Sequence, residues 1–272
     1  MKGTTKSLGQ KNLNDKFYTK PIIAKQLISN FDLQKYDLII EPSAGNGSFS
    51  KNLTNCLALD LFPEDESILQ QDFFSFIPPK VNNCLVIGNP PFGQQAKLAI
   101  AFFRHAASFA NTIAFILPKS FKKHSIQNRL PLNFHLEQEY ELPENSFTLM
   151  GQDYSVPCVF QIWIKKENER EKYIYPMKTS LFTFTKNPLE AHFRVQRVGG
   201  SAGKAFIDKN GAISSNYYLI NTSDYDTEYL VNSINSIEFP SISDTVGPKS
   251  LPKGEFIYEI ENFLQKNKEE AH

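Results

Sequence analysis

The run CLVIGNPPF, residues 84 to 92, begins with four apolar residues and ends with an asparagine, two prolines and an aromatic ring. Three other apolar runs have a similar length: DLIIEP (37–42), CLALDL (56–61) and TIAFILP (112–118). The segment KLAIAFFRHAASFA (97–110) has apolar residues at three- and four-residue spacing, which predicts a helix. Short apolar runs that alternate with such segments are typical of parallel strands buried on both faces. The sequence therefore predicts an α/β fold.

The remaining strands come from less regular segments. NFHLEQEYEL (133–142) and VPCVFQIWI (156–164) follow one another without a helix-length segment between them, so we expect an antiparallel pair. SILQ (67–70) adds a short edge strand. The prediction is a Rossmann-like, seven-stranded open sheet with a terminal antiparallel hairpin, which ends near Lys166.

Three regions of the chain differ in composition. Residues 1–15 form a basic N-terminal tail, residues 16–166 contain the predicted sheet, and ENEREK (167–172) is a charged bridge. After the bridge come a glycine cluster, GGSAGK (199–204), and two segments with helical patterns. We interpret residues 167–272 as a small α+β module.

The charge balance limits what the chain can attract. Twenty-nine basic and twenty-nine acidic residues give no net charge, so affinity for a polyanion depends on uneven placement of Lys and Arg. Such clusters lie at 1–25, 119–135 and 192–204. Each cluster is also what a solvated surface looks like.

Cysteine and histidine usage predicts neither a disulfide nor a metal site. Cys56, Cys84 and Cys158 each lie in an apolar run, which is typical of core thiols in a reducing compartment. The histidines have no ligand spacing, so no metal is expected. No run reaches the ~18 apolar residues of a membrane span, and the first residues do not resemble a secretion signal. The expected location is the cytoplasm, or the nucleus in a nucleated source.

Acidic and glycine residues follow the first two predicted strands. Glu41 begins EPSAGNG, in which Gly45 and Gly47 would let backbone N–H groups approach a ligand, while Ser43 replaces the first glycine of a dinucleotide fingerprint. Asp60 comes nineteen residues after Glu41, close to the ~20-residue offset of a carboxylate that binds ribose hydroxyls. This pattern predicts a nucleoside ligand.

The third strand is followed by QQDFF. Asp72 would accept a hydrogen bond from the amino group of the nucleoside's adenine, and Phe73 or Phe74 would pack on the ring. A capping role for Asp72 at a turn is the structural alternative.

In this order, the motifs resemble class I S-adenosylmethionine-dependent methyltransferases that modify the N6 amino group of adenine in DNA. The resemblance covers roughly residues 16–166 and rests on FYT (17–19) with Pro21, EPSAGNGSF (41–49), Asp60, Asp72-Phe73, NPPF (89–92), LPKSF (117–121) and the closing hairpin. It implies S-adenosylmethionine as cofactor, contacted by Phe17, Tyr18, Thr19, Glu41, Ser43, Gly45, Gly47, Asp60, Asp72 and Phe73. The implied catalytic residues are Asn89, Pro90, Pro91 and Phe92, where Phe92 replaces the tyrosine often found in the family.

The residue types of NPPF suit this chemistry. Adenine N6 is a poor nucleophile because its lone pair is delocalised into the ring. The Asn89 side-chain oxygen and the Pro90 carbonyl would accept from its two hydrogens and favour a more tetrahedral nitrogen. A fixed φ holds the carbonyl direction, and Phe92 would stack on the base. Taken alone, the same letters are also an ordinary turn signal.

A base within a duplex cannot enter such a site, so the target must be flipped out or unpaired. Phe147, with Tyr154 as the alternative, is the candidate to stack on its other face, although core packing is nearly as good an interpretation. Lys119, Lys122 and Lys123 would hold phosphates, and Arg194 and Arg197 would do so in the α+β module, as in target recognition.

Several functions remain open. The leading hypothesis is DNA adenine methylation, as in restriction–modification systems. The same chemistry on RNA adenine or on a protein glutamine is an alternative, because an amide presents a similar planar NH2 group. A catalytically silent subunit that only binds nucleic acid is the third hypothesis.

Overall fold

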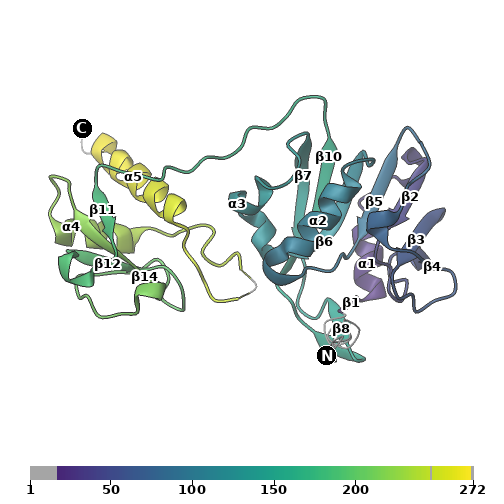
Figure 1. Cartoon of the computed structure of the whole chain (residues 1–272), viewed down its shortest axis with the longest axis horizontal. Helices are drawn as coiled ribbons and strands as arrows, with labels where there is room; N and C mark the ends of the chain where they lie inside the picture. Colours follow the sequence, from purple (N-terminus) through teal and green to yellow (C-terminus); the bar gives the residue numbers. More distant parts are fainter. Residues whose placement is uncertain (1–16, 246, 271–272) are drawn as a thin grey trace, which may run out of the picture. The chain divides into compact units, whose positions relative to one another are not determined.

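The computed structural model describes residues 17–245 and 247–270, which form two compact units (Figure 1). The first unit contains the chain up to Phe121 together with residues 125–171. The second contains residues 122–124 and the chain from Lys172 onward. The main division of the chain therefore falls at the end of the charged bridge ENEREK.

The first unit is built on a seven-stranded sheet in the order β4-β3-β2-β5-β6-β10-β7. Five of its strands are parallel to their neighbours: β2 (Leu38–Glu41), β3 (Cys56–Asp60), β4 (Leu69–Gln70), β5 (Cys84–Gly88) and β6 (Thr112–Pro118). β10 (Cys158–Lys165) runs antiparallel to both β6 and β7 (Phe134–Glu141). The predicted Rossmann-like sheet with a terminal antiparallel hairpin is confirmed.

Both faces of this sheet are buried. On β5, Val86 belongs to one apolar cluster while Leu85 and Ile87 belong to another, because successive side chains point to opposite faces. Helix α2 (Lys97–Ala106) packs its apolar residues into the first cluster, and α1 (Pro21–Ile28) packs into the second. This two-sided burial explains why the strand sequences are almost continuously apolar.

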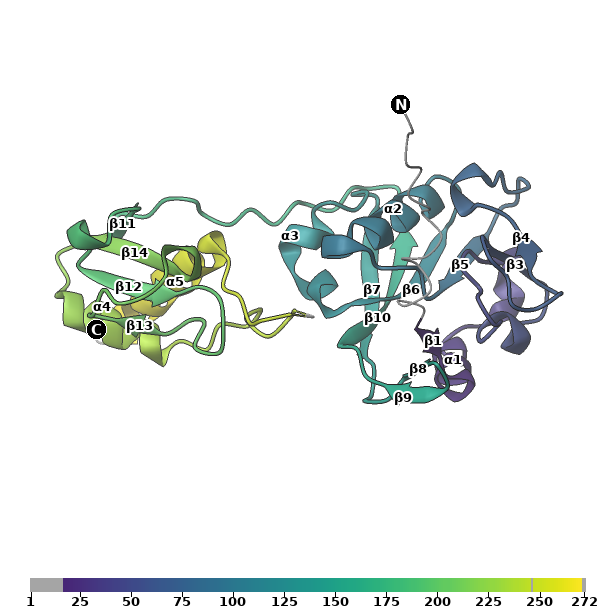
Figure 2. The same ribbon diagram turned by 60° about the horizontal axis from the view of Figure 1, so that its bottom comes forward.

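Shorter elements connect these strands. A separate small sheet, β1-β8-β9, consists of β1 (Tyr18–Thr19), β8 (Phe147–Leu149) and β9 (Gln152–Tyr154), and it lies beside α1 (Figure 2). The other elements are α3 (His124–Gln127) and the 3-10 turns η2 (Leu33–Lys35), η3 (Ser50–Asn52), η4 (Phe73–Ser75), η5 (Gln94–Ala96) and η6 (Lys119–Lys122). The helix expected over 97–110 ends at Ala106.

The three cysteines are free thiols within the first unit. Cys84 and Cys158 are buried and Cys56 is partly buried. Burial raises the pKa of each thiol to about 12, so the side chains act as small core residues.

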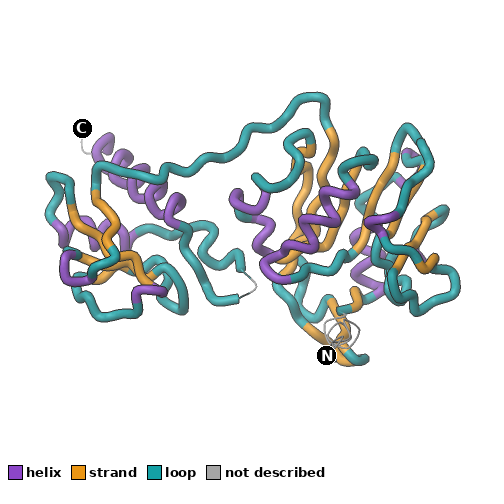
Figure 3. Tube along the Cα trace, in the orientation of Figure 1, coloured by secondary structure: helices purple, strands orange, loops and turns teal. Residues whose placement is uncertain are grey.

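The second unit is an α+β module, as predicted. Residues 166–181 carry no helix or strand and lead into an antiparallel sheet ordered β11-β14-β12-β13 (Figure 3). Its strands are β11 (Phe182–Thr185), β12 (Phe193–Gln196), β13 (Ala205–Phe206) and β14 (Asn216–Asn221), with turns η7 (Pro188–Glu190) and η8 (Ile213–Ser215). Helices α4 (Thr227–Ser236) and α5 (Lys253–Glu270) pack on one face, and they share a core with the sheet. Asp226 caps α4 by accepting from the Glu228 backbone N–H at 2.7 Å.

Two expected absences concern membranes and metals. Among the helices of the described residues, none has both the length and the apolar character that a bilayer crossing requires. Within the same residues, His, Cys, Asp and Glu side chains form no group of three or more suited to a metal ion.

Candidate active site

The candidate site lies where β2, β3 and β5 end, at the carboxyl edge of the parallel strands. These strands are neighbours in the sheet, so Glu41, Asp60 and Asn89 are brought to one edge although they are far apart in sequence. Ligands of open α/β sheets bind at this edge. The strand order therefore brings these three residues to the same edge of the sheet.

Asp60 organises the glycine loop after β2. Its Oδ2 accepts a hydrogen bond from the Gly45 backbone N–H at 2.7 Å, and its Oδ1 accepts from the Phe62 backbone N–H at 2.7 Å. Gly45 and Gly47 have φ angles of +56° and +82°. The Tyr18 ring lies against Gly45, because a Cβ there would be 3.1 Å from its Cε1 atom. Tyr18 also donates to the Glu64 carboxylate, a partner that no sequence pattern identified.

Glu41 is a buried carboxyl group at the end of β2. Its side chain is 2% exposed, and its Oε2 accepts from the Ser50 backbone N–H at 2.8 Å. Burial raises the pKa of Glu41 to about 8, with a smaller contribution from Asp60, while the hydrogen bond from the Ser50 backbone N–H lowers it. Gly88 packs directly on this side chain, because a Cβ there would lie 3.2 Å from Glu41 Cγ at a φ of +149°. The glycine before NPPF is therefore required by close packing.

Asn89 is held by two contacts, and its side-chain oxygen is left unpaired. Asn89 Nδ2 donates to the Phe17 backbone carbonyl at 3.3 Å, and Ser43 Oγ donates to the Asn89 backbone carbonyl at 3.1 Å. Asn89 Oδ1 is buried and receives no hydrogen bond from any described residue. An unpaired buried acceptor costs about 1–3 kcal/mol, so a hydrogen-bond donor at this oxygen would be stabilising.

The unpaired atoms are concentrated near these strand ends. In the part of the chain that the structure describes, five buried side-chain polar atoms lack a partner: Thr19 Oγ1, Ser50 Oγ, Asn89 Oδ1, His105 Nε2 and Arg197 Nε. The first three belong to segments around the candidate site. Thr19 follows Tyr18, the Ser50 backbone N–H donates to Glu41, and the Asn89 side chain donates to the Phe17 carbonyl. A polar ligand would supply the missing bonds.

The rest of NPPF surrounds Asn89 with apolar surface. Pro90 is buried, Pro91 is exposed and Phe92 is partly buried, with its ring packed against both apolar clusters of the sheet. Among the described residues, no backbone N–H outside the helices and strands donates to the Pro90 carbonyl. Two acceptors, the Asn89 side-chain oxygen and the Pro90 carbonyl oxygen, thus come from adjacent residues.

Asp72 and Phe73 lie just after β4. Asp72 is the N-cap of η4, where its Oδ1 accepts from the Phe74 backbone N–H at 3.0 Å. Phe73 is 2% exposed and stacks on Phe102 with ring centroids 5.2 Å apart. The prediction that Phe73 contacts a cofactor ring is therefore wrong, because its ring is buried against Phe102, His105 and Phe109. Phe74 is 43% exposed and is the ring of this pair that a ligand can reach.

Phe147 does not face the site either. Its side chain is 1% exposed within the apolar cluster that contains α1, so the core interpretation holds and the stacking role is wrong. Tyr154, the alternative, is 41% exposed and stacks on Phe17 with ring centroids 4.9 Å apart and an interplanar angle of 19°.

Several predicted phosphate-binding residues are occupied within the protein. Lys119 pairs with Glu141 at 3.4 Å, and Lys122 is partly buried. Lys123 is buried and donates to Ser250 Oγ at 3.3 Å, and burial lowers its pKa. A phosphate role for Lys123 is wrong, because its ammonium group is not presented to solvent.

In the second unit, Arg194 is also internal. It is 8% exposed, forms an ion pair with Asp208 at 3.0 Å, and lies over the Phe206 ring. Its predicted phosphate contact is therefore wrong. Arg197 is partly exposed, donates to the Ser214 carbonyl at 3.0 Å and lies over the Tyr217 ring, so it remains the better candidate of the two.

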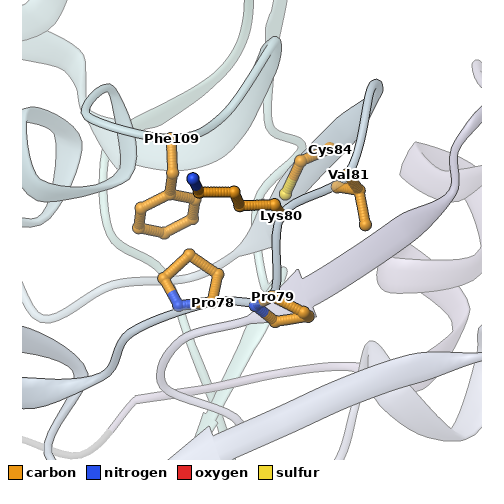
Figure 4. Close-up of a pocket in the computed structure, with 6 residues that line it drawn as sticks. All are labelled: Pro78, Pro79, Lys80, Val81, Cys84 and Phe109. Atoms are coloured by element: carbon orange, nitrogen blue, oxygen red, sulfur yellow. The ribbon is translucent and has the colours of Figure 1, made fainter.

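Two surface hollows lie at the other edge of the sheet, next to the amino ends of β2 and β5. One is lined by Asp37, Lys80, Val81 and Asn82. In the other, the Phe109 ring faces Pro78 with the Lys80 side chain beside it (Figure 4), and the lining residues are Pro78, Pro79, Lys80, Val81, Cys84 and Phe109. Neither hollow contains a residue of the candidate site.

No model of a known protein family matches the sequence, and no curated protein matches it. Solved structures with a similar fold include PH1948 from Pyrococcus horikoshii, provisionally described as an RNA methyltransferase, with 16% identity and a TM-score of 0.43. That match covers 61% of this chain and 93% of PH1948. The 23S rRNA methyltransferase ErmE has 11% identity and a TM-score of 0.40, covering 57% of this chain and 71% of ErmE. Similarity this distant carries no conclusion about the reaction of this chain.

Proposed function

We propose that the chain transfers a methyl group from S-adenosylmethionine to the N6 amino group of adenine in DNA that is flipped out or single-stranded. The observation that carries the proposal is the unpaired, buried Asn89 Oδ1, which is followed in the chain by a Pro90 carbonyl that receives no backbone hydrogen bond. Two acceptors on adjacent residues match the two hydrogens of a planar amino group. The Phe92 ring next to them offers a flat apolar surface for the base.

The residues at the strand ends fit the proposed cofactor. A carboxylate has about four lone-pair sites, and the two backbone N–H groups on Asp60 use only two of them. Asp60 can therefore also accept from the two hydroxyls of a ribose. Asp72 uses one oxygen for its capping bond, so its second oxygen can accept from an adenine amino group.

The other residues proposed to hold the cofactor are Phe17, Tyr18, Thr19, Glu41, Ser43, Gly45 and Gly47. Thr19 is 4% exposed and its Oγ1 has no partner among the described residues, which supports a contact with a polar ligand. Bound there, the cofactor supplies a methyl group on a positively charged sulfur, which needs no metal.

The chain's own contribution is to orient and polarise the target amine. Hydrogen bonds to Asn89 Oδ1 and the Pro90 carbonyl would hold both N6 hydrogens and direct the nitrogen lone pair away from these acceptors. Because these acceptors are fixed by the fold before the substrate arrives, they cost no reorganisation during the reaction. Pro90 and Pro91 restrict φ, so the carbonyl direction is fixed by covalent geometry.

Charge in the first unit is a constraint on how DNA would bind. Five lysines there are paired with carboxylates: Lys20 with Asp153, Lys35 with Asp32, Lys51 with Asp65, Lys119 with Glu141 and Lys166 with Glu137. Paired cations attract phosphates weakly, so the salt dependence of binding is expected to be shallow for this unit. We propose that residues 167–272, including Arg197, take part in target recognition.

The test is transfer of labelled methyl groups from S-adenosylmethionine to unmethylated DNA, with RNA and glutamine-containing protein as parallel substrates. Asn89→Ala is expected to abolish transfer while cofactor affinity, measured by titration calorimetry, stays near the wild-type value. Asn82→Ala, at an exposed asparagine just before the amino end of β5, is the matched control. Transfer to RNA or protein but not to DNA refutes the substrate class, and failure to bind the cofactor supports the silent-subunit hypothesis.

A further inference from the structure

The Asn89 amide has two ends of almost the same shape, and only one of them can serve the proposed reaction. If the NH2 end faced the target amine, two donors would oppose each other and no hydrogen bond would form. The fold must therefore select one of two orientations of the side chain. Something next to Asn89 has to distinguish nitrogen from oxygen.

The Phe17 backbone carbonyl makes this distinction. A carbonyl oxygen accepts hydrogen bonds and cannot donate them, so only Nδ2 of Asn89 can face it favourably, as it does at 3.3 Å. This contact turns Oδ1 to the opposite side of the amide, where it has no partner among residues 17–245 and 247–270. The orientation thus follows from the chemistry of the two groups.

Phe17 is in turn held by the β8–β9 hairpin. Its ring stacks on Tyr154 of β9 with ring centroids 4.9 Å apart. The residues after it are fixed by the same hairpin, since β1 pairs antiparallel with β8 and Lys20 pairs with Asp153 at 2.6 Å. The Lys20 backbone N–H donates to the Ser146 carbonyl at 3.0 Å.

We infer that Tyr154 is a positioning residue for the proposed methyl transfer: by stacking on Phe17 it holds the carbonyl that orients the Asn89 amide. The inference rests on the proposed function for the role of Asn89. Tyr154 acts here through Phe17, which distinguishes it from an aromatic residue that stacks on the substrate base.

The first experiment compares Tyr154→Ala with Tyr154→Phe in the full chain, using unmethylated DNA at saturating cofactor. Tyr154→Ala is expected to lower kcat at least ~10-fold, because small displacements of an orienting group have effects of this size. Tyr154→Phe keeps the ring and is expected to retain nearly full kcat. A rise in KM for DNA with unchanged kcat in Tyr154→Ala would mean that Tyr154 contacts the substrate instead, and would overturn the inference.

The second experiment isolates the bond to Phe17. Asn89→Asp keeps an acceptor for the target amine but places a second oxygen against the Phe17 carbonyl. At pH 8 we expect a loss of roughly 100-fold in kcat, comparable to the loss of one oriented hydrogen bond in an active site. Activity should recover partly as the pH falls towards 5, because a protonated carboxyl group can donate to Phe17. Activity close to wild type at pH 8 would overturn the inference.

A third measurement does not depend on catalysis. The side-chain NH2 resonances of Asn89, identified by comparison with Asn89→Asp, should show slowed hydrogen exchange in the wild type and in Tyr154→Phe. Exchange at least ~10-fold faster is expected in Tyr154→Ala, since a weaker contact opens more often. If no nucleic acid or protein is methylated but these rates differ as expected, the proposed function fails and the positioning contact stands. Equal rates in all three proteins would overturn the contact.

Discussion

The buried Glu41 carboxyl group makes the stability of the first unit depend on pH. In the folded chain burial raises the pKa of Glu41 to about 8, whereas its ordinary value is 4.5. Below pH 4.5 the side chain is protonated in both the folded and unfolded chains. Between pH 4.5 and 8 the unfolded chain releases a proton that the folded chain retains, so the free energy of unfolding falls as the pH rises. Above pH 8 both forms are ionised and the loss is complete.

The size of the effect follows from the distance between the two pKa values. Each factor of ten in proton affinity is worth about 1.4 kcal/mol, so the loss is roughly 3 to 4 kcal/mol between pH 5 and 8. Glu41→Gln removes the titration and keeps an oxygen that can accept from the Ser50 N–H. From pH 5 to 8 the wild type should therefore lose roughly 3 to 4 kcal/mol of unfolding free energy relative to this variant.

Urea denaturation at a series of pH values measures this difference. Trp163 is the single tryptophan, is 1% exposed and lies in the first unit, so its fluorescence reports on that unit. Glu144→Gln, at an exposed position, controls for the loss of a surface carboxylate. If wild type and Glu41→Gln lose stability in parallel from pH 5 to 8, Glu41 is ionised in the folded chain and the reasoning from burial is refuted.

Three other substitutions test the structure. Phe147→Ala should lower the free energy of unfolding by about 3–5 kcal/mol in urea, as for a core phenylalanine, and an unchanged stability with weaker DNA binding would restore its stacking role. Gly88→Ala should cost roughly 1–3 kcal/mol in the same assay, because its Cβ would press on Glu41 at a positive φ; wild-type stability would show that the loop adapts freely. Arg194→Ala should lower the melting temperature of the second unit, measured by calorimetry, through loss of its pair with Asp208. Its affinity for labelled DNA should be unchanged, and a tenfold loss without destabilisation would make Arg194 a phosphate contact after all.

The sheet could be predicted from the sequence because each of its strands carries a local signal. DLII, CLALD and TIAFILP are continuous apolar runs, which two-sided burial requires, and the residues that end them come to one edge once the strands are parallel. Asp60 and Asn89 lie at this edge for that reason. The spacing from Glu41 to Asp60 was informative since it reflects one strand–turn–strand unit.

The error at Phe73 comes from its position next to a second phenylalanine. In a strand or a short turn, adjacent residues face opposite ways, so a shift of one position exchanges a core residue for a surface residue. Phe73 and Phe74 are indistinguishable in sequence, yet one is 2% and the other 43% exposed. No local pattern told which of the two would be buried.

The errors at Lys123 and Arg194 arise from distant partners. Lys123 donates to Ser250, which lies 127 residues away, and Arg194 pairs with Asp208 across a strand connection. A run of basic residues predicts a surface for phosphates only where the cations have no partners in the fold. Such partners are set by tertiary structure, so composition alone could not identify them.

The antiparallel arrangement of β7 and β10 determines where this unit can change. Residues 142–157 leave the sheet after β7 and re-enter it at β10, so both ends of this excursion lie at the same rim as Asn89. A parallel pair would need a covering helix between its strands, whereas the tip of this excursion can be lengthened without moving any of the seven strands. A segment inserted at Met150-Gly151, the tip of the β8–β9 turn, would extend the protein surface at this rim without changing the sheet.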